Sequence, residues 1–234
     1  MSYRVLDPGK TVETISILQN RIIERFPSSG LGSVCDELYN IANEAKDKVE
    51  WIKKPNILLR TGVYITIFIA LLLLIYSVTV IDVKDDKFAL RDVVQLVESV
   101  VNDIVFIGIA IFFLTTVEIR IKRSRALAAL HELRAISHVI DMHQLTKDPG
   151  KIIKKATSTA SSPQRTMTAF ELTRYLDYCS EMLALTGKIS ALYAQNLNDS
   201  VVLAAVNELE SLTTGLSRKI WQKIIILHKL DETR

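Results

Sequence analysis

The sequence is poor in the residues that most often mark a reactive site. Its only two cysteines, Cys35 and Cys179, lie far apart and form no C-x-x-C pair, so neither a zinc site nor a disulfide framework is indicated. Its eight glycines form no phosphate-binding loop and no dinucleotide fingerprint, and a G-x-S-x-G nucleophile elbow is missing. We therefore expect a noncatalytic protein that carries no cofactor.

An excess of charge of one sign is also missing. The formal net charge is +3, aromatic residues make up 7% of the chain, and the basic residues stand beside apolar segments. Nucleic-acid binding would favour a basic face with interleaved aromatic residues, so we expect no nucleic-acid partner. A hydrophobic fraction of 49% beside a charged fraction of 24% indicates separate apolar and charged blocks, and a lipid bilayer as partner.

One apolar block is long enough to cross a membrane. No charged residue occurs from Thr61 to Ile81, about 21 residues, and at 1.5 Å per residue such a helix matches the ~30 Å hydrocarbon layer. Arg60 at its start can reach the headgroups, and Tyr64 and Tyr76 near its ends suit the membrane–water interface. We predict a first span over 61–81.

A second apolar block, from Ile104 to Val117, is short for a span. Extending it upstream supplies the missing length but places Asn102 and Asp103 within the layer or at its edge. A buried core helix is the alternative interpretation of this block. The basic stretch that follows is typical of a stop-transfer flank, so we predict a second span over 100–117. The basic residues assigned to the membrane interface beyond it are Arg120, Lys122 and Arg123.

Basic residues flank the pair of spans and are fewer between them. The residues counted are Lys46, Lys48, Lys53, Lys54 and Arg60 before the first span, Arg120, Lys122, Arg123 and Arg125 after the second, and Lys84, Lys87 and Arg91 between them. Because cytoplasmic flanks carry the excess of Lys and Arg, we expect both termini in the cytoplasm. The location that we expect is the inner (plasma) membrane of a bacterium.

Outside the spans, apolar residues recur at three- and four-residue steps and no segment has the pattern of a strand, so we predict an all-α fold. One amphipathic helix precedes Pro27, and a second begins at Ser33. Because neither Gly nor Pro occurs between Gly108 and Pro149, the helix of the second span is expected to continue into the cytoplasm. Thr168 and Glu171 have the spacing of a capping box and begin a later helix.

The predicted organisation is thus a transmembrane helical hairpin with a cytoplasmic helical bundle and a long second-span helix that extends into the cytoplasm. Its segments are N-terminal amphipathic helices over 1–54, the hairpin over 55–119 with an outer loop over 82–99, the cytoplasmic extension over 120–145, a linker over 146–167 and a cytoplasmic helical hairpin over 168–234.

The extension of the second span carries the densest group of metal-ligand residue types. His131, His138 and Asp141 share one helical stripe. Arg134 lies in the same stripe, and its permanent charge disfavours a cation there. The spacing also differs from the H-E-x-x-H pattern of zinc-binding helices. Structural packing or contacts between subunits therefore explain the stripe better than a metal site.

Polar residues at the outer end of the second span form a second candidate group. Glu98 and Asn102 are one helical turn apart, and Asp103 follows directly. In an oligomer these residues could form acidic rings that attract cations at the mouth of a pore. The simpler interpretation is that the helix begins in the interface and the acids stay in water.

Two functions follow from these patterns. The first is a noncatalytic integral membrane protein whose cytoplasmic helices mediate self-association, as in a coiled-coil homo-oligomer, or bind a cytoplasmic protein partner. The alternative is a small oligomeric cation channel or transporter with the second span lining the pore.

Overall fold

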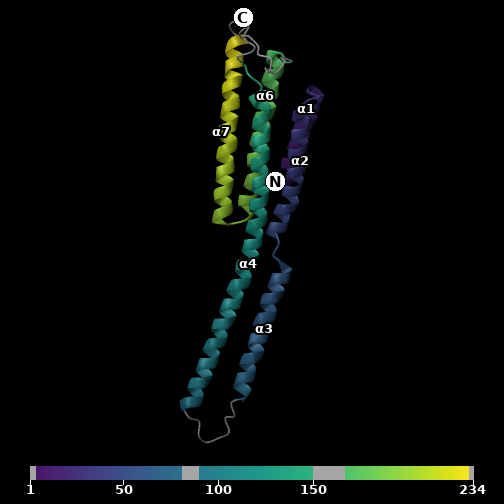
Figure 1. Cartoon of the computed structure of the whole chain (residues 1–234). Coiled ribbons are helices and arrows are strands. Elements are labelled where there is room, and N and C mark those ends of the chain that lie inside the picture. The colour runs from purple at the N-terminus through teal and green to yellow at the C-terminus, as the bar shows by residue number, and fades with distance from the viewer. Residues whose placement is uncertain (1–3, 81–89, 150–166, 232–234) are drawn as a thin grey trace. The chain divides into compact units, whose positions relative to one another are not determined.

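The computed structural model describes residues 4–80, 90–149 and 167–231, and within them every regular element is a helix. The prediction of an all-α chain is therefore confirmed. The helices, labelled as in Figure 1, are α1 (Pro8–Arg25), α2 (Gly30–Lys53), α3 (Ile57–Val80), α4 (Leu90–Leu145), α6 (Ala169–Asn196) and α7 (Ser200–Asp231).

Two helix starts differ from the sequence-based expectation. α2 begins at Gly30 rather than Ser33, since the Gly32 N–H already donates to the Ser29 carbonyl and Leu31 is fully buried. α4 begins at Leu90, so the end of the predicted 82–99 loop is helical, because no Gly or Pro interrupts the chain there. The rest of that loop, and most of the predicted 146–167 linker, lie outside the described residues.

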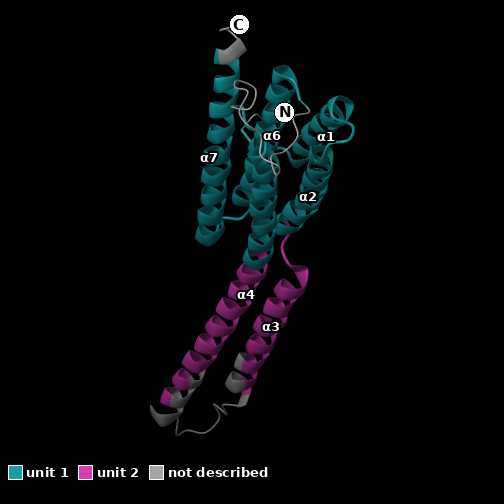
Figure 2. Cartoon of the chain, turned by 45° about the horizontal axis from the view of Figure 1, so that its top comes forward, with its two compact units in different colours: residues 1–53, 123–234 teal, residues 54–122 magenta. Residues whose placement is uncertain are grey.

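The chain divides into two compact units, and α4 contributes residues to both (Figure 2). We call residues 54–122 the hairpin unit, and residues 1–53 together with 123–234 the bundle unit.

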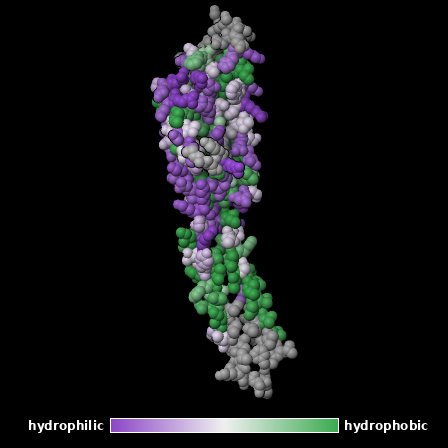
Figure 3. Space-filling model, turned by 180° about the vertical axis from the view of Figure 1, so that it is seen from behind, coloured by the Kyte–Doolittle hydropathy of each residue, from purple (hydrophilic) through white to green (hydrophobic). Residues whose placement is uncertain are grey.

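The hairpin unit consists of α3 and the first part of α4, which lie side by side (Figure 1). Both α3 and α4 are long and apolar enough to cross a membrane. Their large apolar side chains are not packed into a core: Phe68 is 61% exposed and Phe112 is 72% exposed. Figure 3 shows hydrophobic residues covering the visible face of this unit. Such exposure is unlike that of a core helix of a soluble protein, which buries these side chains.

The bundle unit is built from two helical hairpins, α1–α2 and α6–α7, and the last part of α4 (Figure 2). Asp7 caps α1, because its Oδ1 accepts the backbone N–H of Gly9 at 2.8 Å. The predicted capping box of α6 is present, with Thr168 and Glu171 each bonding the backbone of the other. These caps begin the helices whose apolar faces form the shared core.

Both cysteines lie in that core. The side chains of Cys35 on α2 and Cys179 on α6 are fully buried and reduced. Loss of hydration on burial raises the pKa of each thiol to about 12, so neither forms the reactive thiolate at neutral pH.

We therefore expect the folded chain in mild detergent to react with an aromatic disulfide reagent such as DTNB at neither cysteine. Denaturation with guanidinium chloride is expected to expose both thiols, so the absorbance of the released thiolate then corresponds to two per chain. Rapid labelling of one thiol without denaturant would show that the core is not packed as described.

Candidate functional site

All six residues considered for ion or metal binding lie on α4. The last part of α4, in the bundle unit, has ion pairs with a neighbouring helix on each of two sides. Toward α2, Lys48 Nζ is 3.3 Å from Glu132 Oε2. Toward α7, Arg134 Nη2 is 2.8 Å from Glu208 Oε2. These pairs are exposed and contribute little stability, but they identify the neighbouring helix along each edge of α4.

A stronger polar contact joins α4 to the turn between α6 and α7. Arg123 donates from Nε and Nη2 to Asp199 Oδ2, at 2.9 and 2.6 Å. Asp199 also caps α7, because its Oδ1 accepts the N–H groups of Val201 and Val202, each at 3.1 Å. Its side chain is only 4% exposed. The hydrogen bonds from the Arg123 guanidinium hold the pKa of Asp199 below its ordinary value.

The end of α4 is joined to α7 through a buried amide. Lys223 Nζ donates to the backbone carbonyl of Gln144 at 2.8 Å and to its Oε1 at 2.6 Å. Gln144 in turn donates from Nε2 to Asp141 Oδ1 at 2.6 Å. Burial lowers the pKa of Lys223. The ammonium group is therefore a second donor to the Gln144 carbonyl, which also accepts the Lys147 N–H at 3.1 Å near the C-terminus of α4.

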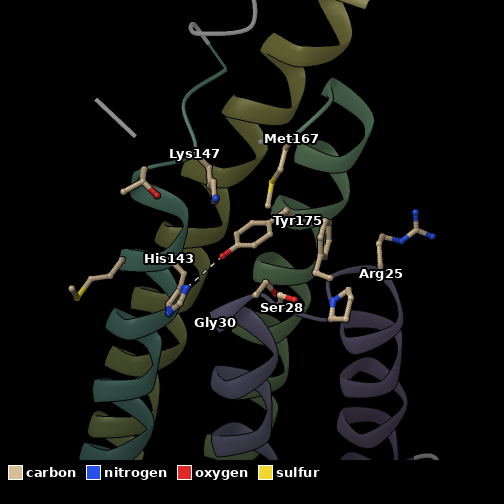
Figure 4. A pocket seen from close by; sticks show the side chains of 12 residues that line it. Arg25, Ser28, Gly30, His143, Lys147, Met167 and Tyr175 are labelled. Carbon is tan, nitrogen blue, oxygen red and sulfur yellow. Dashed lines mark hydrogen bonds between the residues drawn. The ribbon is translucent and has the colours of Figure 1, made fainter. Parts of the chain in front are cut away.

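A surface pocket of about 640 Å³ lies where α4 ends and α2 and α6 begin (Figure 4). His143 Nδ1 and the Tyr175 hydroxyl are 3.4 Å apart in it, and the Lys147 ammonium group lies 5.0 Å from the centre of the Tyr175 ring. A Cβ atom added to Gly30 would be 2.9 Å from the His143 ring, so only glycine fits there without a shift. Tyr175 thus contacts both His143 and Lys147 at this end of the bundle unit.

The predicted metal-ligand stripe is not brought together as a site. His131 and His138 are exposed, whereas Asp141 is half-buried and bonded to Gln144. Among the described residues, no three His, Cys, Asp or Glu side chains converge as a metal site would require. The feature that these two histidines share is exposure on one face of α4.

The predicted membrane-interface residues lie in the hairpin unit or just beyond it. Arg60, Tyr64, Tyr76 and Arg120 have exposed side chains. Arg123 instead belongs to the bundle unit, where its guanidinium group binds Asp199.

The Lys122 side chain does not extend into solvent either. Its Nζ is 2.8 Å from Glu118 Oε1, one helical turn away, and its side chain is only 12% exposed. The same carboxylate oxygen accepts the backbone N–H of Asn56 at 3.2 Å, next to the start of α3. Glu118 therefore connects the two helices of the hairpin unit at this end.

The polar residues proposed for a pore lie near the beginning of α4. Glu98 and Asn102 are exposed and Asp103 is half-buried. The first two differ by four positions in one helix and therefore share a face.

Asp199 and Lys223 had no role in the sequence-based expectations. Asp199 is 76 positions from Arg123, and Lys223 is 79 positions from Gln144, so no local spacing could predict either pair. The Glu118–Lys122 pair has i,i+4 spacing and could have been found from the sequence. Comparison of the chain with protein-family models, with curated proteins and with solved structures found no match.

We expect Asp199→Ala to lower the free energy of unfolding of the bundle unit by about 2 kcal/mol, because it removes both the cap of α7 and the carboxylate that neutralises Arg123. Asp199→Asn keeps a capping oxygen and is expected to cost less. The measurement is thermal unfolding of the full chain in detergent, followed by circular dichroism. Asn198→Ala, an exposed change in the same turn, is the control and is expected to have no effect.

The pH dependence of the Asp199→Asn effect gives a separate test. A carboxyl group whose folded pKa is lowered stabilises the fold above its unfolded pKa of about 3.9, and this contribution is lost as the pH falls through the lower folded value. The difference in melting temperature between wild type and Asp199→Asn is therefore expected to be largest near pH 6 and to become smaller below about pH 4. A constant difference across that range would contradict a charged contact with Arg123.

Proposed function

We propose that this chain is a noncatalytic integral membrane protein in which α3 and α4 cross the bilayer and the bundle unit lies in the cytoplasm and mediates self-association. The observation that carries the proposal is the exposed face of α4 in the bundle unit. Met142 and Leu145 on that face are 66% and 61% exposed, although neighbouring helices border α4 on both sides.

The membrane part of the proposal rests on the hairpin unit. Its two helices are long and apolar enough to span the hydrocarbon layer, and their aromatic and branched side chains are exposed. Backbone hydrogen bonds within each helix satisfy the peptide groups that a bilayer cannot. The excess of Lys and Arg on the flanks supports a topology with both termini in the cytoplasm and the connection over 82–89 outside.

The self-association part rests on apolar surface outside the hairpin unit. Exposed contiguous apolar surface on a soluble unit is typical of a binding face. No nucleotide, metal or nucleic-acid motif offers another use for it in the sequence. A second copy is held in the same plane by membrane anchoring, which raises its effective concentration.

Cross-linking in native membranes tests self-association. An amine-reactive cross-linker is expected to convert much of the chain into dimers or larger species, and light scattering of the protein in mild detergent is expected to give the same subunit number. Only monomers in both measurements would contradict the proposal.

Topology is tested separately with two cysteine variants in the wild-type chain, whose own thiols are buried. A membrane-impermeant maleimide added to intact cells is expected to label Asp85→Cys and to spare Ser124→Cys, which places an exposed thiol at the start of the bundle unit. Disruption of the cells is expected to make Ser124→Cys reactive. Labelling of Ser124→Cys in intact cells would contradict a cytoplasmic bundle unit.

A cation channel remains the second candidate, supported by the exposed face that Glu98 and Asn102 share on α4. Carboxylates around a pore mouth raise the local concentration of cations. In liposomes, purified protein is then expected to conduct cations, and Glu98→Gln or Asp103→Asn is expected to reduce the flux. Absence of flux, or flux that neither change alters, would refute the channel without affecting the self-association proposal.

A further inference from the structure

One exposed stripe of α4 follows the spacing of a coiled-coil seam. Its side chains, which we call the α4 stripe, are separated by steps of three, four, three, four and three residues, and every one is exposed. They are Ala128, His131, Ala135, His138, Met142 and Leu145. Alternation of three and four is the a/d pattern that keeps one seam of a helix facing another helix over successive turns.

The same part of α4 has a second, buried face. Leu133 and Ile140 are completely buried, and Leu130 and Ile136 nearly so. The α4 stripe is therefore additional to the core contacts of the bundle unit and is not needed to fill them. The exposed stripe also carries apolar side chains, Met142 and Leu145 the largest, so α4 has apolar surface on two sides.

We propose that the α4 stripe pairs with the same stripe of a second copy as a parallel two-stranded coiled coil. This inference rests on the proposed function, and it deepens that proposal by naming the face that self-associates. The occupant is a helix rather than a lipid or a small ligand, because neither of those requires a three–four repeat sustained from Ala128 to Leu145.

The direction of pairing follows from α4 itself. α4 is one continuous helix from its apolar beginning, in the hairpin unit, through the stripe. Copies inserted with the same topology have their α4 helices pointing the same way. Identical residues then face each other in register, as a two-fold axis parallel to the helices requires.

Charge along the two edges of the stripe suits this symmetry. Glu132 lies on the edge toward α2, and Arg134 lies on the edge toward α7. In a parallel pair, the α2-side edge of one copy lies beside the α7-side edge of the other. The symmetry therefore places neither Glu132 nor Arg134 opposite its own counterpart in the other copy.

The side chains of the stripe allow close helix contact while limiting its strength. Alanine at positions 128 and 135 lets two backbones approach, and methionine adapts to an irregular gap. The histidines at 131 and 138 place polar groups at the seam, which favours a defined register at a cost in stability. A pair of this composition is suited to chains already confined to one membrane.

Disulfide cross-linking in native membranes tests the seam directly. Ala135→Cys, on the α4 stripe, is expected to give a disulfide-linked homodimer on mild oxidation with copper–phenanthroline. Ala204→Cys on α7 is the matched control, because it is the same substitution at an exposed position outside the α4 stripe. Equal dimer yields from the two variants, or a disulfide only to a different protein, would overturn the proposal.

A charge variant tests whether the seam holds the copies together. Ala135→Glu places two carboxylates opposite each other and is expected to weaken association of the detergent-solubilised full chain at least tenfold, whereas Ala204→Glu is expected to leave it unchanged. Unchanged circular dichroism melting of Ala135→Glu separates lost pairing from lost folding, since position 135 is exposed.

The outcomes distinguish self-association in general from pairing through the α4 stripe. A wild-type oligomer that Ala135→Glu leaves intact, with no Ala135→Cys disulfide, would refute the α4 stripe while preserving self-association through another face. A wild-type chain that is monomeric in both membranes and detergent would refute both. Dimer formation that depends on position 135 and not on position 204 supports the seam.

Discussion

The unbroken backbone hydrogen bonding of α4 is the constraint on which the rest of the structure depends. One helix runs from Leu90 to Leu145 and supplies residues to both compact units. Neither glycine nor proline occurs in it beyond Gly108, so the regular i→i−4 pattern is not opened at the boundary between the units. Because the backbone does not change there, the two parts of α4 differ only in the side chains that they present.

Those side chains change character along the helix. Before the boundary, large apolar groups such as Phe113 are exposed, whereas beyond it Leu133 and Ile140 are buried in a core shared with other helices. Apolar burial is favourable but non-directional, so it does not by itself fix how far α4 slides along its neighbours. Hydrogen bonds, which are directional, fix this position at both ends of the part of α4 that lies in the bundle unit. Arg123 binds Asp199 at its beginning, and Gln144 binds Lys223 at its end.

Burial determines which face of α4 stays outside. Leu133 and Ile140 lie in the core, and the exposed ion pairs of Glu132 toward α2 and Arg134 toward α7 mark the two edges of the opposite face. The face between them carries His131, His138 and Met142 in exposed positions. Each square ångström of apolar surface left in water forgoes roughly 25 cal/mol of stabilisation. The proposed pairing of two copies places that surface in a contact.

The sequence by itself determined the features that depend on neighbouring residues: the helical class, the two apolar helices of membrane-spanning length and the Thr168–Glu171 capping box. Each arises from backbone geometry or composition within a few turns, which a local pattern contains. The early start of α4 at Leu90 was missed because the helix was predicted only from the start of the second span, although no Gly or Pro breaks it before that point. Only the tertiary structure decided that Arg123 meets Asp199, that the His143 ring lies against Gly30 and that the two histidines of the α4 stripe face outward. Those outcomes depend on how separate helices pack around a common core, and residues 76 positions apart leave no local spacing from which their contact can be read.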